Sequence, residues 1–266
     1  MPTWQVVSKQ NHANAGWTSP TDYRQTKHLS VIPALAGEFG HLIPTYPMAF
    51  LKNSTGKFQL CVLLGLKKHC NAFLDLNNRW TAQYVPANLR SYPFSLMESS
   101  NGQQVLAVDA DSDFFHIEAQ TNDKPVLNQA GTAHDSLKEL IQFMGQRHIQ
   151  QLQTDHAVDL LAQHQVLKEW QESVITEDGS SEQTVLKGLY CFDEKALQHL
   201  DGDALQTLAS KGALGVAYAQ LYSQTRLKYL VKRQQWHDKQ THSAQTSNVD
   251  LDKLFGESDS DDLFTF

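Results

Sequence analysis

The chain has 266 residues, 41% of them hydrophobic, so it can bury a core without help from metals or disulfides. Its formal net charge of -7 argues against proteins that bind nucleic acid through a clustered basic face. The three cysteines, Cys61, Cys70 and Cys191, are too few and too widely spaced for a disulfide framework or a zinc ribbon.

The N-terminus has neither a basic region nor an apolar stretch of the kind found in signal peptides. The longest apolar run, Leu60 to Leu66, is far shorter than the roughly 20 residues that span a bilayer. We therefore expect a cytoplasmic protein with no membrane span.

The first half of the chain, from about Trp4 to Glu118, has the alternation and the Pro, Gly and Asn punctuation of strands. The almost continuously apolar run Phe58–Leu66 is typical of a central strand buried on both faces, and Asn53-Ser54-Thr55-Gly56 before it suits a hairpin loop. The candidate strands are Tyr46–Leu51, Phe58–Leu66, Thr81–Val85, Val105–Asp109 and Phe114–Glu118.

The pattern then changes to a helical period. Ser136-Leu137-Lys138-Glu139 has the form of a capping box, in which the Ser hydroxyl and the Glu carboxylate bond the amides of a first helical turn. A second helix is predicted from about Asp155 to Leu167.

Further along, Asp178-Gly179 predicts the turn of a small hairpin. Its strands would be Trp170–Ile175 and Val185–Phe192. Three helices follow: one from Asp193 to Leu200, one capped by Asp201 or Asp203 that stops at Gly212, and an amphipathic one over about Ala213 to Val231.

These elements predict an α+β protein. A mostly antiparallel sheet in the N-terminal half packs against C-terminal helices, with a small hairpin between them and a disordered acidic tail at the end. Residues 1–233 would form a single globular domain, residues 234–249 a polar linker, and residues 250–266 an acidic-aromatic tail.

Three groups of residues carry a resemblance to a known family. They are Gly37-Glu38-Phe39 with Tyr46-Pro47-Met48-Ala49-Phe50; Asn71–Asp75 leading to the phrase Trp80–Phe94 (WTAQYVPANLRSYPF); and Gly188–Tyr190 with Asp193–Leu197 and Leu208–Leu221. Over most of residues 5–230 the chain resembles the SapC family, bacterial proteins of about this length whose name comes from a surface-layer-associated protein. The resemblance implies a family but establishes no activity.

The most specific phrase also contains the densest group of candidate ligand-binding residues. An arginine among aromatic rings suits a carboxylate or a planar acid, because the guanidinium supplies paired donors and the rings supply contact area. The alternative is a structural role, which is more common for such clusters. In that case Arg90 pairs with Glu38 or a backbone carbonyl and holds a Pro-rich turn. The candidates are Glu38, Tyr46, Asn71, Trp80, Tyr84, Arg90, Tyr92 and Phe94.

No familiar catalytic or cofactor-binding motif is present. The chain has no GxSxG elbow, no P-loop and no GxGxxG, and its twelve histidines are scattered. Asp109 to Asp113 begins like a calcium loop, but Phe114 and Gln120 replace the Gly and Glu that such a loop needs, so an Asx-rich turn is favoured. We expect no bound metal or cofactor.

The tail, residues 250–266, carries six acids and one base, which is -5 of the total charge of -7. Acids beside Leu and Phe are typical of a docking peptide that enters a basic, apolar groove. The alternative is a solubilising tail that folds back on the body. The residues expected to bind a protein partner are Leu251, Leu254, Phe255, Leu263, Phe264 and Phe266.

The favoured functional hypothesis is a non-enzymatic binding or adaptor protein that recognises a peptide or small acid near Arg90 and recruits a protein partner through its tail. The first alternative is an enzyme, or an accessory subunit of one, with a cleft around Trp80–Phe94. A surface-layer role rests on the family name alone.

Overall fold

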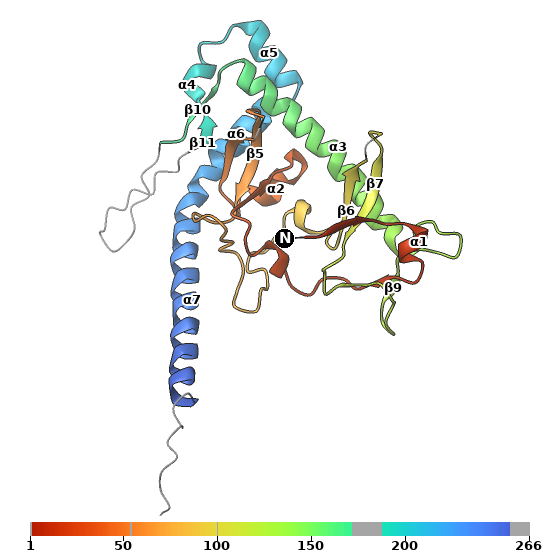
Figure 1. Cartoon of the computed structure of the whole chain (residues 1–266). Coiled ribbons are helices and arrows are strands. Elements are labelled where there is room, and N and C mark those ends of the chain that lie inside the picture. Colours follow the sequence, from red (N-terminus) through yellow and green to blue (C-terminus); the bar gives the residue numbers. More distant parts are fainter. Residues whose placement is uncertain (1, 54, 100, 172–187, 256–266) are drawn as a thin grey trace, which may run out of the picture.

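The computed structural model describes residues 2–53, 55–99, 101–171 and 188–255, and for residues 242–255 it describes the backbone only. Antiparallel sheets from the first half of the chain pack against helices from the second, so the predicted α+β class is confirmed (Figure 1).

Every sheet is antiparallel and most strands are short. The strands are β1 Trp4–Val6, β2 Gly16–Trp17, β3 Val31–Pro33, β4 Met48–Lys52, β5 Phe58–Leu63, β6 Phe94–Glu98, β7 Gln104–Asp109, β8 Phe115–His116, β9 Lys124–Pro125, β10 Leu167–Glu169 and β11 Leu189–Phe192. They form a five-stranded sheet in the order β10-β11-β4-β5-β3 and two three-stranded sheets, β1-β7-β6 and β8-β2-β9.

The helices include two long ones. The α-helices are α1 Lys9–His12, α2 Phe39–Leu42, α3 Asp135–Gln163, α4 Glu194–Leu197, α5 Gly202–Ser210, α6 Ala213–Ser223 and α7 Leu227–Phe255. Single turns of 3-10 helix are η1 Arg24–Thr26, η2 Ala36–Glu38, η3 Ala87–Leu89 and η4 Gln224–Arg226. α7 extends well away from the rest of the molecule (Figure 1).

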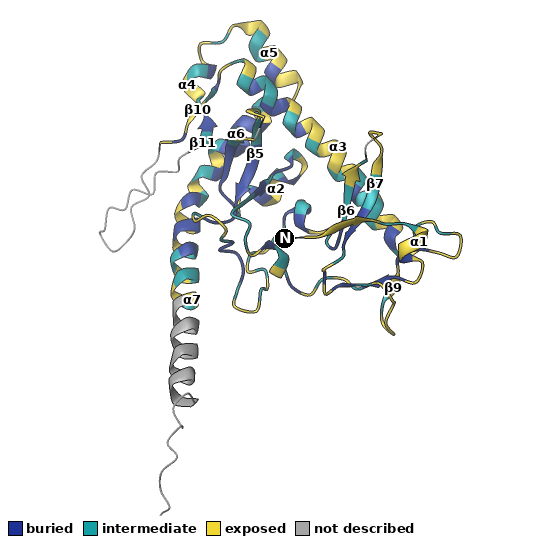
Figure 2. Ribbon diagram, viewed as in Figure 1, coloured by how far each residue is buried: buried dark blue, intermediate teal, exposed yellow. Residues whose placement is uncertain are grey.

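Two hydrophobic cores form, one against the five-stranded sheet and one between the two smaller sheets. β5 is an inner strand of the five-stranded sheet, paired with β4 and β3, and Leu60 and Val62 of its apolar run are fully buried (Figure 2). α3 bridges the two cores, because Leu137 and Met144 pack in the second core while Val158 and Leu161 pack in the first.

The predicted strand Thr81–Val85 is wrong, since these residues form a loop. The carbonyl oxygen of Tyr84 accepts a hydrogen bond from Trp80 Nε1 at 3.0 Å and another from the Tyr46 hydroxyl. Side chains thus take the place of a neighbouring strand, which a pattern of β-prone residues cannot reveal.

The two helices predicted over 136–144 and 155–167 are one helix, α3. Its N-cap is His134, whose Nδ1 accepts from the Ser136 N–H at 3.2 Å, so the predicted capping box is wrong. Ser136 Oγ instead donates to the carbonyl of Pro125. Thr154, in the polar middle of this helix, fixes the helix to η2. It is buried and accepts a hydrogen bond from the Ala36 N–H at 3.0 Å.

The other C-terminal predictions are largely confirmed. β10 and β11 pair as neighbours, but β10 ends at Glu169, before the predicted strand Trp170–Ile175, whose described residues Trp170 and Gln171 are in no strand. The Asp178-Gly179 turn lies outside the described residues. Asp193 caps α4, Asp201 rather than Asp203 caps α5, and Gly212 adopts a left-handed φ of 73° just after α5.

The last predicted helix ends later than expected and is interrupted. The segment Ala213–Val231 is divided by η4, and α7 continues past it, so the polar linker predicted from residue 234 is wrong for residues 234–241. Gln234 explains the error: it is buried, and its Oε1 accepts from the Leu66 N–H at 3.1 Å. Because Gln234 is polar, the sequence around it lacks the hydrophobic periodicity by which a buried helical face is recognised.

No helix in the described part of the chain is both long and apolar enough to cross a bilayer. The tail residues from 256 onward are not among those described.

α1 contributes a buried histidine to the fold. His12 is 1% exposed, its Nδ1 accepts from the Ser8 N–H at 3.2 Å, and its ring lies 5.8 Å from that of Phe115. Burial lowers the pKa of His12 below its ordinary value of 6.5.

We expect this histidine to make the fold sensitive to mild acid. Unfolded His12 takes up a proton near pH 6.5, whereas the folded side chain does so only at lower pH, so the free energy of unfolding should fall as the pH drops below 6.5. His12→Asn, which keeps an acceptor for Ser8, should flatten this dependence in urea titrations between about pH 5 and 7. Equal slopes for both proteins would contradict the prediction.

Candidate functional site

Glu38 lies at the centre of the predicted ligand-binding group. It ends η2 and is 5% exposed. Its Oε1 accepts from the Tyr84 hydroxyl at 2.6 Å and from the Ala87 N–H at 2.7 Å. Its Oε2 is buried and has no hydrogen-bond partner among the described residues. Glu38 therefore fixes the start of η3, just before Arg90.

Arg90 pairs with Glu38, as predicted if its role is structural. Its Nη2 lies 3.7 Å from Glu38 Oε1 and 3.3 Å from the Tyr84 hydroxyl. The guanidinium carbon is 5.0 Å from the centre of the Phe143 ring and 5.5 Å from that of Tyr84. The side chain is nevertheless 42% exposed, so part of the guanidinium faces solvent.

Three of the predicted aromatic residues form one hydrogen-bonded group. Trp80 Nε1 donates to the Tyr46 hydroxyl at 3.0 Å, and burial raises the pKa of Tyr46. Burial and the bond to Glu38 raise the pKa of Tyr84 to about 12. His41 stacks on the Tyr84 ring with centroids 4.5 Å apart. Both tyrosines are thus neutral donors at ordinary pH.

The remaining candidates lie elsewhere. Asn71 is buried and bonds Thr26 and the Phe73 N–H, which holds a loop. Tyr92 donates to Asp109 Oδ2 at 2.8 Å. Phe94 begins β6 and packs edge-on against Trp17 in the second core. The structure therefore brings Glu38, Tyr46, Trp80, Tyr84 and Arg90 together and separates Asn71, Tyr92 and Phe94 from them.

Tyr92 and Phe94 instead border a cavity of about 240 Å³ between the two cores. Leu89 of the first core and Phe94 of the second both line it. Its lining residues are Pro2, Trp4, Gln25, Thr26, His28, Leu29, Asn88, Leu89, Ser91, Tyr92, Phe94, Ser95 and Arg147.

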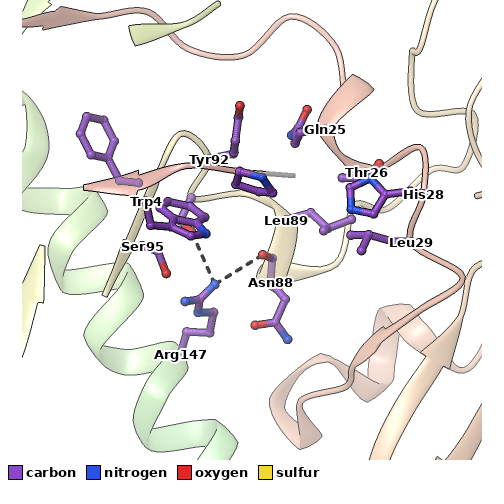
Figure 3. A pocket seen from close by; sticks show the side chains of 13 residues that line it. Trp4, Gln25, Thr26, His28, Leu29, Asn88, Leu89, Tyr92, Ser95 and Arg147 are labelled. Atoms are coloured by element: carbon purple, nitrogen blue, oxygen red, sulfur yellow. Dashed lines mark hydrogen bonds between the residues drawn. The ribbon is translucent and has the colours of Figure 1, made fainter. Parts of the chain in front are cut away.

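Arg147 supplies the cavity's positive charge. It extends from the middle of α3, and its Nη1 makes long hydrogen bonds of 3.4 Å to the Asn88 carbonyl and to Ser91 Oγ (Figure 3). Burial lowers the pKa of Arg147, while the charge of Glu38 raises it. The guanidinium keeps its charge, so a cation with weakly bonded donors faces the cavity.

Polar groups lie across the cavity from Arg147. Gln25 and His28 come from η1 and the residues after it, on the side of the cavity away from α3 (Figure 3). The Gln25 amide oxygen and nitrogen are both buried and have no hydrogen-bond partner among the described residues. A buried amide without partners is costly, and a bound polar molecule would satisfy it.

The sequence interpretation missed Arg147, Gln25 and His28. Arg147 falls in the polar stretch between the two helices that α3 replaces, and the other two lie in a segment assigned to no element. Five residues of the phrase Trp80–Phe94 line the cavity: Asn88, Leu89, Ser91, Tyr92 and Phe94.

Together these features define an α+β protein with two hydrophobic cores, one bridging helix and a polar cavity where the cores meet. A family model described as SapC matches residues 7–230. The chain therefore belongs to the SapC family, as the resemblance indicated. No curated protein and no solved structure matches it.

Proposed function

We propose that this protein is a non-enzymatic binding protein for a small carboxylic acid, held in the cavity by Arg147. The supporting observation is that a half-buried guanidinium with two long hydrogen bonds lines the cavity. A carboxylate would accept paired, charge-assisted bonds from this side chain.

The cavity walls favour a ligand with an apolar body. Leu29, Leu89 and Phe94 supply apolar surface, and the Gln25 amide could bond a second polar group of the ligand. The volume of about 240 Å³ is below the range of roughly 300–1,000 Å³ typical of drug-sized ligands. A monocarboxylate with one ring fits this description.

The site predicted around Arg90 remains an alternative anchor for the same kind of ligand. Its exposed guanidinium and its tyrosine neighbours suit a carboxylate at the surface, including that of a peptide.

The tail, residues 250–266, is proposed as a docking segment for a protein partner. An enzyme with a cleft around Trp80–Phe94, and a surface-layer role, are the remaining candidates.

Titration calorimetry with benzoate and its neutral isostere benzamide tests the proposal. Benzoate should bind at least about tenfold more tightly than benzamide, because only the carboxylate forms a charged pair with Arg147. Arg147→Gln should remove this preference, and Arg147→Lys, which keeps the charge but loses the planar fork, should retain part of it.

Two further arginine variants complete the design. Arg79→Gln, which removes an exposed charge from a loop, should leave binding unchanged. Arg90→Gln separates the two anchors: loss of benzoate binding in this variant, with binding retained in Arg147→Gln, would move the site to Arg90. If benzoate binds no better than benzamide to folded wild-type protein, the proposal is wrong.

A further inference from the structure

Exposed aromatic side chains recur at a regular sequence spacing along the last two helices. Four large aromatic residues are exposed in the described part of the chain, and three of them, Tyr222, Tyr229 and Trp236, lie seven residues apart on α6 and α7. They are 60%, 52% and 45% exposed. Single exposed aromatics are ordinary, but a row of three on adjoining helices is typical of an interaction surface.

The opposite face of α7 explains why these residues face outward. Leu227, Leu230, Val231 and Gln234 are buried against the body at the spacing of one helical face. Tyr229 and Trp236 therefore project from the other face, where with Thr81, Lys232 and Arg233 they line a groove of about 450 Å³.

The aromatic row is also strongly basic. The segment from Arg226 to Lys239 contains five basic residues and one acid, a net charge of +4 in a chain whose total is -7. The acid, Asp238, pairs with Lys67 at 2.8 Å. The bases are Arg226, Lys228, Lys232, Arg233 and Lys239.

Several of these cations are already held against rings. The Arg226 guanidinium and the Lys228 ammonium each lie 5.2 Å from the centre of the Tyr229 ring. The Arg233 guanidinium lies 4.5 Å from the Phe73 ring and bonds Thr81 Oγ1, which fixes one wall of the groove. The surface is thus a preformed groove suited to an acidic segment with apolar anchors.

The same chain carries such a segment. Residues 250–266 have a net charge of -5 and two groups of acids beside Leu and Phe, around Leu254-Phe255 and Leu263-Phe264. Charge and hydrophobic character are therefore complementary between the groove and the tail.

Geometry favours the tail of another molecule over the chain's own. α7 runs to Phe255, and at about 1.5 Å per residue its end lies roughly 39 Å along the axis from Tyr229. Leu254 and Phe255 thus cannot meet the groove of their own helix. The eleven residues beyond span at most about 36 Å, so even fully extended they fall short of Tyr229 and reach only the Trp236 end of the groove. A second copy running antiparallel can present both Leu-Phe groups.

We propose that two copies associate reciprocally, the acidic tail of each lying in the Tyr229–Trp236 groove of the other. This assignment rests on the proposed docking role of the tail and names its partner as a second copy. A reciprocal pair has two identical contacts related by a two-fold axis, the commonest symmetry of homo-oligomers. The two contacts reinforce each other because the first raises the effective concentration for the second.

Light scattering of the full chain after gel filtration provides the first test. The mass should approach twice 30.0 kDa as the concentration rises over about 1–100 μM. Because the contact pairs opposite charges, the dimer dissociation constant should increase at least about tenfold between roughly 50 mM and 500 mM salt.

Charge reversal provides the decisive test. Lys228→Glu with Lys232→Glu reverses two charges beside the groove and removes its net charge of +4, and Asp261→Lys with Asp262→Lys reverses two charges of the tail and lowers its net charge from -5 to -1. Each double variant alone should dimerise at least about tenfold more weakly. An equimolar mixture of the two should form heterodimers, because the unaltered groove of one variant then meets the unaltered tail of the other, and the introduced glutamates meet the introduced lysines. Lys57→Glu with Lys211→Glu, at exposed positions off the row, is the matched control.

A chain that stays monomeric at every concentration, a dimer indifferent to both reversals, or a mixture without heterodimers would overturn the inference. Benzoate binding by the same samples separates this failure from failure of the proposed ligand-binding function.

Discussion

Glu38→Ala should destabilise the protein by about 3–5 kcal/mol, the cost typical of removing one partner from a buried charged group. The substitution removes the acceptor of the Tyr84 hydroxyl and of the Ala87 N–H, which hold the loop before Arg90. It also removes the negative charge that favours the charged form of the half-buried Arg147. Thermal unfolding should show a fall in Tm on the order of 10 °C.

Two variants bracket this effect. Glu38→Gln keeps an acceptor and loses only the charge, so its cost should be smaller, about 1–3 kcal/mol. Glu118→Ala removes an exposed acid and should change the stability by no more than about 0.5 kcal/mol. If Glu38→Ala is as stable as Glu118→Ala, the carboxylate does not hold the loop and the account of this site is wrong.

Gln220→Leu should cost about 2–5 kcal/mol, because it leaves two buried backbone groups unpaired at about 1–3 kcal/mol each. Gln220 is fully buried in α6; its Oε1 accepts from the Phe192 N–H at 2.9 Å and its Nε2 donates to the Met48 carbonyl at 3.1 Å. The pairing of β11 with β4 consists of Leu189 with Leu51 and Tyr190 with Phe50. Gln220 of α6 therefore links β11 to β4 beyond the last backbone pair of these two strands.

Urea denaturation measures the loss, and two variants control for it. Ser223→Ala removes the acceptor of the Met48 N–H and the donor to the Gln220 carbonyl, leaves one backbone N–H unpaired, and should cost about 1 kcal/mol. Gln198→Leu makes the same substitution at an exposed position and should be nearly neutral. A loss below about 1 kcal/mol for Gln220→Leu would mean that water or a shifted backbone satisfies both groups.

The division into two cores gives the cavity its place. α3 is the element common to both cores, and Arg147 leaves it between the stretch that packs in the second core and the stretch that packs in the first. Crevices between packed units are frequent ligand sites, since side chains from independent elements converge there. Substitutions of Arg147 therefore act on the ligand site and on the charge balance with Glu38 together, which is why the fold of each variant needs its own measurement.

The sequence by itself determined the features that depend on neighbouring residues. The apolar run Phe58–Leu66 contains β5, an inner strand of the five-stranded sheet, Asp193 and Asp201 capped their helices, and Gly212 took the left-handed conformation that a helix end favours. The family also followed from local phrases of sequence. Hydrophobic periodicity and helix capping involve residues close together in the chain, so both can be predicted from the sequence without knowledge of the tertiary structure.

Only the tertiary structure decided which distant polar groups meet. Tyr84 left the predicted strand because Tyr46 and Trp80 bond its carbonyl, and Gln234 extended α7 because it bonds a loop near residue 66. Arg147 lies 109 residues from Glu38 in the sequence, and only folding brings the two charges into interaction. A polar side chain satisfied by a remote partner has no sequence period of its own, because its stability comes from the partner that the fold supplies.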